Sequence, residues 1–115
     1  VTEVEAAEIL EDFRREQTGY VGPSFETISA FGPNGAVIHY KPEPTSCSEL
    51  GTDSLFLVDS GGQYGCGTTD VTRTVHLRPE DAPAHLRSCW THVLRAHIAC
   101  DRAVFPEGVT GYQID

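Results

Sequence analysis

The sequence predicts an α+β fold in which helices pack on one face of an antiparallel sheet. Three observations lead to this prediction. Apolar residues recur at helical spacing over residues 2–17 and again from about residue 80 onward. The region between them contains short β-rich runs, one of which alternates strictly between two faces. The chain has 115 residues and no internal repeat, so we expect one small domain at most.

The first helix is predicted within "VTEVEAAEILEDFRREQ". Thr2 is followed three residues later by Glu5, which fits a capping box at the start of a helix. The apolar stripe at helical spacing consists of Val4, Ala7, Leu10 and Phe13. Two glycines and a proline in "TGYVGPS" then end the helix.

A hairpin is predicted over residues 25–40, "FETISAFGPNGAVIHY". Its first arm alternates in polarity, "GPNG" supplies the turn, and "AVIHY" forms the returning arm. The polar, proline-containing segment that follows is expected to be a loop.

Two strands and a long helix complete the prediction. "LFLVD" is nearly all apolar, as is typical of a strand buried on both faces, and "DVTRTV" is a β-branched, alternating strand. The helix starts near Glu80 and ends before Pro106 and Gly108. The stripe that we expect in the core consists of Leu86, Cys89, Trp90, Val93, Ala96, Cys100 and Val104.

The composition excludes several functions. A net charge of −9 disfavours binding to nucleic acid, whose phosphates require a basic surface. No apolar run is long enough to span a membrane, and no signal peptide is recognisable, so we expect no membrane partner. Four cysteines without CxxC pairing are expected to be reduced, in a cytoplasmic protein. The chain begins at valine, contains no methionine and stops within a new amphipathic element, so we expect a piece of a longer protein.

Two aspartates occupy positions where a sheet usually carries apolar or β-branched residues. Asp59 closes the apolar strand and Asp70 opens the alternating one, with a glycine-rich ten-residue connection between them. If the two strands pair symmetrically, Asp59 and Asp70 lie directly opposite each other, with Cβ atoms roughly 4.5–5.5 Å apart. Two carboxylates that close either share a proton or bind a cation, and oxygen ligands favour Mn²⁺ or Mg²⁺. Spacing alone leaves a second interpretation open, because an aspartate at a strand end is often only a turn former.

Three stretches of the chain resemble one family. "VDSGGQYGCGTTDVTRTVHL" closely resembles the signature of Xaa-Pro aminopeptidases, also called aminopeptidase P, which are metallopeptidases of the pita-bread fold. "FETISAFGPNGAVIHYKP" and "THVLRAHIACDRAVFPEGVTGYQID" resemble two further stretches of the same family, closest to its eukaryotic cytosolic form. The resemblance implies that residues 1–115 are a single partial domain, the N-terminal half of the pita-bread catalytic domain.

The resemblance also implies a site and a reaction. Asp59 would bind one of two divalent ions, typically manganese, and Asp70 would bridge both. A histidine and two glutamates from a later part of the fold would complete the ligand set, and His39 would contact the substrate and assist proton transfer. The substrate would be a peptide with proline at its second position, from which the N-terminal residue is removed. A homodimer of the full-length protein is a further expectation.

Two departures and two alternatives accompany the resemblance. The family usually has aspartate where this chain has Cys66, and glycine where it has Arg78, a position that we expect to be left-handed. His76 shares a strand face with Asp70, but we expect it to lie too far along the strand to be a ligand.

Two alternative functions remain open from the sequence. One is a non-catalytic pita-bread module that binds peptides or proteins, and the other is a prolidase-like dipeptidase. With only two ligands, the chain by itself is expected to be inactive.

Overall fold

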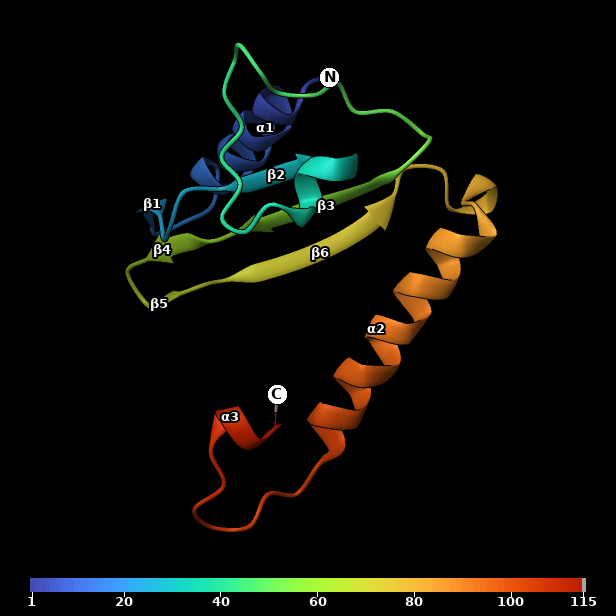
Figure 1. Ribbon diagram of the computed structural model, residues 1–115. Coiled ribbons are helices and arrows are strands. Elements are labelled where there is room, and N and C mark those ends of the chain that lie inside the picture. The colour runs from blue at the N-terminus through green and yellow to red at the C-terminus, as the bar shows by residue number, and fades with distance from the viewer. Residues whose placement is uncertain (115) are drawn as a thin grey trace. The chain divides into compact units, whose positions relative to one another are not determined.

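The computed structural model describes residues 1–114, so Asp115 lies outside the described residues. The chain falls into two compact units, of which the first spans residues 1–82 and the second begins at Pro83. The first unit contains a helix and two three-stranded antiparallel sheets (Figure 1). The second unit is helical. Together they confirm the predicted α+β class.

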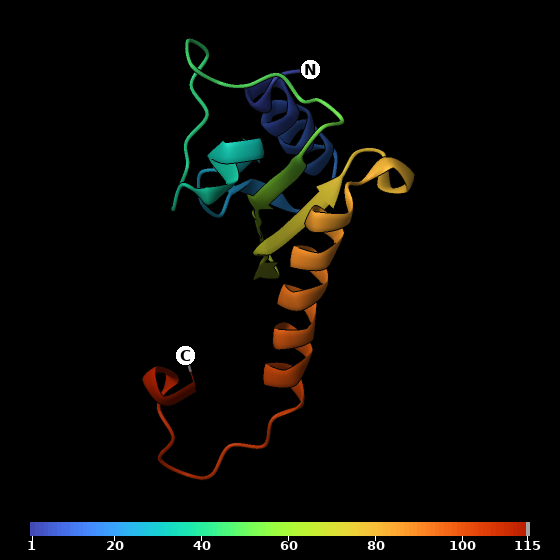
Figure 2. The same cartoon turned by 45° about the vertical axis from the view of Figure 1, so that its right-hand side comes forward.

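The first helix, α1 (Glu3–Arg15), begins as the sequence predicts. The Thr2 hydroxyl accepts a hydrogen bond from the Glu5 N–H at 3.2 Å, and the Glu5 carboxylate accepts one from the Thr2 N–H at 2.7 Å. This reciprocal pair is the capping box, which satisfies two donors that the helix itself cannot. The helix packs against strands β1 (Tyr20–Pro23) and β2 (Ile28–Phe31), as Figures 1 and 2 show.

The sheet that carries the candidate site has the order β2-β3-β6, with β3 (Leu55–Ser60) in the centre and β6 (Val71–His76) at the far edge. Both predicted strands are therefore present, although the side chains of β3 are mostly half-buried rather than fully covered. Among residues 1–114, the buried apolar residues are Ala30 and Phe31, and both belong to β2. Glu3 is buried beside them and is completely inaccessible to solvent.

The predicted hairpin over residues 25–40 is wrong in its second arm. The first arm is β2, but it pairs with β3, and residues Gly32–Ala36 form a 3-10 helix, η1. Pro33 favours this short helix at its start, and a left-handed residue at position 39 (φ 55°) interrupts any extended run before Tyr40. The segment "AVIHY" is consequently a turn and loop, and it carries His39 to the sheet without belonging to it.

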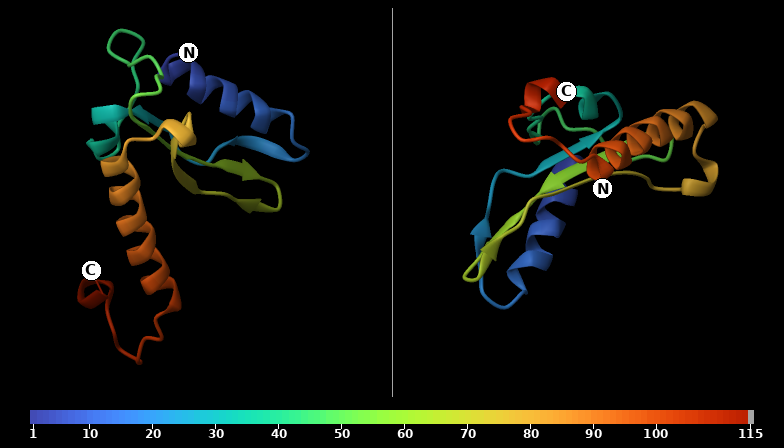
Figure 3. Two further views of the ribbon diagram at one scale, coloured as in Figure 1. Left: turned by 90° about the vertical axis from the view of Figure 1, so that its right-hand side faces the viewer. Right: turned by 90° about the horizontal axis from the view of Figure 1, so that it is seen from below.

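A second small sheet extends the ribbon that β3 and β6 begin. Strands β4 (Gly62–Tyr64) and β5 (Gly67–Thr68) pair antiparallel, and β1 joins the other side of β4. Gly65 and Cys66 form the two-residue turn between β4 and β5. The path from β3 through this turn to β6 is one long hairpin, which Figure 3 shows from the side.

The second unit contains helix α2 (Ala84–Arg102) and the short helix α3 (Gly111–Ile114), while the 3-10 turn η2 (Pro79–Asp81) closes the first unit. Six of the seven residues of the apolar stripe lie on α2, and Val104 lies beyond its end. The assignment of the stripe to the core is wrong, because no side chain of α2 is buried and Val104 is exposed. Trp90 is 44% exposed, Val93 70% and Val104 95%, and Cys89 and Cys100 are exposed too. A stripe is buried only where another layer covers it. None of the described helices combines the length and apolar character that crossing a bilayer requires.

Candidate metal centre

Asp59 lies near the end of the central strand, where the ladder fixes its backbone on both sides. It pairs with Ile28 of β2 and with Thr72 of β6. Its Oδ1 atom is buried and has no hydrogen-bond partner within residues 1–114. Leaving a buried acceptor without a partner costs about 1–3 kcal/mol, and more when the group is charged. The backbone position of this carboxylate is therefore fixed, and a bound cation would compensate its buried oxygen.

Asp70 lies directly before β6, and its position corrects the predicted register. Thr72, rather than Asp70, is directly opposite Asp59, so the two aspartates are diagonal neighbours. The ribbon turns at Gly65 and Cys66, and this tight turn sets the pairing two residues away from the symmetric arrangement that was expected. Because side chains alternate with a period of two, a shift of two residues keeps both aspartates on the same face. Diagonal neighbours lie roughly 7–8 Å apart, with their Cβ atoms somewhat closer, so the carboxylates can converge.

The glycine-rich connection brings the chain close to itself just before Asp70. A Cβ atom on Gly61 would lie 1.9 Å from the Thr69 carbonyl oxygen and 2.3 Å from the Ser24 hydroxyl oxygen. That hydroxyl donates a hydrogen bond to the Thr69 carbonyl at 2.8 Å. The Thr69 N–H donates a hydrogen bond to the Gly62 carbonyl at 2.9 Å, and the Gly62 N–H donates one to the Thr69 hydroxyl, also at 2.9 Å. Only glycine fits at position 61, and the close contact fixes the residue that precedes Asp70.

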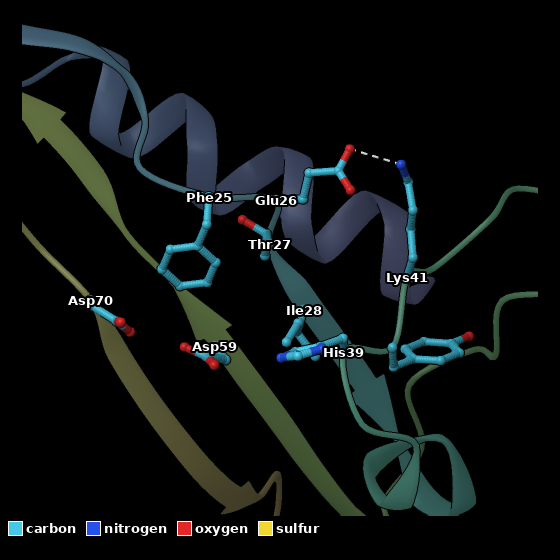
Figure 4. A pocket seen from close by; sticks show the side chains of 9 residues that line it. Phe25, Glu26, Thr27, Ile28, His39, Lys41, Asp59 and Asp70 are labelled. Carbon is cyan, nitrogen blue, oxygen red and sulfur yellow. Dashed lines mark hydrogen bonds and ion pairs between the residues drawn. The ribbon is translucent and has the colours of Figure 1, made fainter.

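His39 has the only left-handed backbone among the non-glycine residues that the structure describes, with φ 55°. Histidine tolerates this conformation better than most residues, but it remains uncommon. Such strain persists where the surroundings enforce it, and it is concentrated at functional sites. In Figure 4 the imidazole of His39 points toward Asp59, and the carboxylates of Asp59 and Asp70 turn toward each other.

The three predicted site residues line one cavity of about 370 Å³ in the first unit. Sequence reasoning missed the rest of its lining, which consists of Phe25, Glu26, Thr27, Ile28, Tyr40 and Lys41. Lys41 and Glu26 form an exposed ion pair of 2.7 Å at this cavity. The Glu26 carboxylate raises the pKa of Lys41 above its usual value through this hydrogen bond. With three carboxylates and one ammonium, the cavity carries net negative charge and suits cations.

The donor set fits hard divalent cations but is incomplete. Asp59 and Asp70 offer carboxylate oxygens, the ligand type that Mg²⁺ and Mn²⁺ prefer. Within residues 1–114, no group of three or more His, Cys, Asp or Glu side chains is close enough to hold a metal ion. Two carboxylates leave most coordination positions to water or to residues from elsewhere.

His76 and Arg78 lie away from this cavity. The His76 side chain is buried, and its Nδ1 atom lies 2.6 Å from the Arg78 carbonyl oxygen. The prediction that Arg78 is left-handed is wrong, because its φ is −131°. An extended backbone there carries a bulky side chain without strain.

Comparison with known proteins identifies the family. The sequence profile described as metallopeptidase family M24 matches residues 1–115. This chain belongs to metallopeptidase family M24. Aminopeptidase P2 of Arabidopsis thaliana is 54% identical over 115 residues, which are 100% of this chain and 16% of that protein. A probable Xaa-Pro aminopeptidase P of Neurospora crassa is 55% identical over 98% of this chain and 16% of its own length.

Two solved structures share the fold of this M24 chain. The X-prolyl aminopeptidase of Caenorhabditis elegans, described as a cytosolic enzyme with a di-nuclear active site, superposes with a TM-score of 0.87. It is 43% identical, over 99% of this chain and 18% of its own. A prolidase from Thermococcus sibiricus has a TM-score of 0.78 at 29% identity, over 90% of this chain and 27% of its own. The antiparallel sheets and helices thus match those of pita-bread enzymes, and the chain spans less than a third of each relative named here.

Proposed function

We propose that this chain is part of a metallo-aminopeptidase that removes the N-terminal residue preceding proline. Asp59 and Asp70 would supply two carboxylate ligands of its dinuclear metal centre. A histidine and two glutamates outside this chain complete the set. The observation that carries the proposal is the convergence of Asp59, Asp70 and His39 on one cavity, with one oxygen of Asp59 buried and unpaired.

The residues of this chain have two roles in the proposed hydrolysis, metal binding and proton transfer. Bound divalent cations lower the pKa of a coordinated water and polarise the scissile carbonyl. Asp59 on β3 and Asp70 directly before β6 would hold the cations through their carboxylate oxygens. His39 is placed to donate an imidazole N–H to the carbonyl oxygen as negative charge develops there, or to move a proton to the leaving nitrogen.

The lining of the cavity fits a peptide whose second residue is proline. An amide on the nitrogen of proline offers no N–H group, so the site must bind it through the carbonyl oxygen and through apolar contact. Phe25 and Ile28 supply apolar surface directly beside the acids (Figure 4). The negative lining also favours the free ammonium group at the peptide's N-terminus.

Several finer features belong to the same proposal. The metal in the cell is Mn²⁺, the protein acts in the cytoplasm, and the complete enzyme is a homodimer. Residues 1–115 are a single partial domain of the catalytic fold, the N-terminal half, to which both compact units contribute.

The test is turnover of an Xaa-Pro peptide by the complete protein with added Mn²⁺. Asp59→Asn and Asp70→Asn should each abolish release of the N-terminal residue and lower the number of bound ions measured by metal analysis. Asp53→Asn, which changes an exposed aspartate outside the cavity, is the matched control and should leave both unchanged. Full activity in Asp59→Asn and Asp70→Asn would refute the proposal and favour a non-catalytic binding module.

A prolidase-like dipeptidase is the second candidate, since a prolidase is among the structural neighbours. The two differ in the length of the accepted substrate. Comparison of kcat/KM for an Xaa-Pro dipeptide and for the same sequence extended by several residues separates them. A strong preference for the dipeptide would favour the prolidase-like function.

A further inference from the structure

The chain immediately around His39 is not held by strand pairing. Its segment runs from η1 to β3, and the hydrogen bonds near His39 are those of short turns, including Tyr40 N–H to the Val37 carbonyl at 3.2 Å. Strand-type pairing of this segment occurs farther along, where Glu49 pairs with Thr2. A left-handed histidine costs free energy, so something must constrain the chain on both sides of it. The structure provides that constraint through the side chain of one buried acid.

Glu3 is completely buried and binds this segment at several points. Its carboxylate accepts hydrogen bonds from the Phe31 N–H at 2.5 Å, the Tyr40 hydroxyl at 2.8 Å and the Ser48 N–H at 2.8 Å. The Asn34 side-chain amide donates to it at 3.0 Å. These donors span residues 31–48, and His39 lies between two of them.

The negative charge of the Glu3 carboxylate is stabilised by hydrogen-bond donors. Burial by itself would raise the pKa of the Glu3 carboxyl, but the hydrogen bonds from Phe31, Asn34, Ser48 and Tyr40 outweigh this effect and hold the pKa below its usual value of 4.5. Burial is the larger cause, and the hydrogen bond to Glu3 the second, of a rise in the pKa of Tyr40 to about 12. The carboxylate thereby holds its four donors in one fixed arrangement.

We propose that Glu3 and Tyr40 are positioning residues for His39. The Tyr40 hydroxyl is tied to Glu3 while Tyr40 also lines the cavity, so the residue next to His39 cannot rotate freely. Asn34 restrains the chain on the other side. The imidazole is thereby kept in the cavity that Asp59 and Asp70 line. The inference rests on the proposed function in assigning His39 a part in catalysis.

The test is a double-mutant cycle in the complete protein, measured as kcat and KM on an Xaa-Pro peptide. Tyr40→Phe removes only the hydroxyl and should lower kcat about tenfold with little change in KM. In a His39→Ala background, Tyr40→Phe should have no further effect, because the group that it positions is already gone. Glu3→Gln, which keeps the shape of the side chain, should behave in the same way.

A matched control is available at the other end of α1, where Tyr20 of β1 contacts the helix. The Tyr20 hydroxyl donates to the Glu11 carboxylate, the same chemistry at the other end of α1 and outside the cavity. Tyr20→Phe should leave kcat unchanged. The inference is overturned if Tyr40→Phe leaves kcat unchanged, or lowers it by the same factor whether or not His39 is present.

A second readout keeps this inference separate from the proposed function. If the wild-type protein does not hydrolyse Xaa-Pro peptides, the proposed function fails, and crystal structures of the variants decide the inference. Loss of the left-handed conformation at His39 in Tyr40→Phe, with retention in Tyr20→Phe, would support it. Retention of that conformation in both variants would overturn it.

Discussion

Gly61→Ala is the sharpest test of how the ribbon delivers Asp70 to the cavity. The new methyl group would lie 1.9 Å from the Thr69 carbonyl oxygen, whereas ordinary contact begins at 3.4 Å. The Thr69 carbonyl must therefore retreat by about 1.5 Å, since the obstacle is backbone rather than a flexible side chain. Thr69 precedes Asp70 directly, so the displacement passes to the candidate ligand.

The expected loss follows from these distances. Overpacking at such a site costs about 1–3 kcal/mol of the free energy of unfolding. Misplacing a reacting group by about 1 Å can cost about 100-fold in rate, so kcat/KM for an Xaa-Pro peptide should fall by about that factor. We expect weaker Mn²⁺ binding as well, measured by titration of the complete protein alongside urea unfolding.

Gly65→Ala serves as the control on the same ribbon. A Cβ atom there meets nothing within 4 Å, and Gly65 is not left-handed, so stability and turnover should be nearly unchanged. If Gly61→Ala matched Gly65→Ala in unfolding free energy, metal affinity and kcat/KM, the close approach at Gly61 would have no bearing on the site.

Three further predictions concern the first unit and the chain as a whole. Thr2→Ala removes the capping hydroxyl of α1 and should lower the free energy of unfolding by about 0.5–2 kcal/mol, whereas Thr2→Ser should restore it; equal stabilities would contradict the capping role. Because the pKa of Glu3 is lower in the folded state than its usual 4.5, Glu3 stabilises the fold fully above pH 4.5, and this contribution is lost as pH falls through the folded-state pKa. Unfolding curves of wild type and Glu3→Gln should therefore differ most above pH 4.5 and converge in acid; a constant difference would exclude this linkage. Residues 1–115 alone, with added Mn²⁺, should release no amino acid from an Xaa-Pro peptide, because two carboxylates are too few ligands, and measured turnover would disprove this expectation.

The sequence predicted best those elements whose signals are local. The capping box at Thr2 and Glu5, the apolar run of β3 and the alternation of β6 each depend on neighbouring residues, and each is present in the structure. The face shared by Asp59 and Asp70 was also predicted, because it depends only on the period of two along a strand.

What the sequence could not supply depends on contacts between distant residues. The register of Asp59 against Thr72 follows from where the ribbon turns, and the glycines offered several possible turns. Strand β1 is only four residues long and forms by pairing with β4. The left-handed His39 replaced an expected strand because buried Glu3, thirty-six positions earlier in the chain, binds the segment around it.

The sparse apolar core has a practical consequence for anyone expressing this segment. Ala30 and Phe31 are the buried apolar residues of the described chain, while large apolar side chains such as Trp90, Val93 and Phe105 meet solvent. Uncovered apolar surface of this kind promotes self-association. A recombinant product of these 115 residues should therefore elute from size-exclusion columns as aggregates at high concentration.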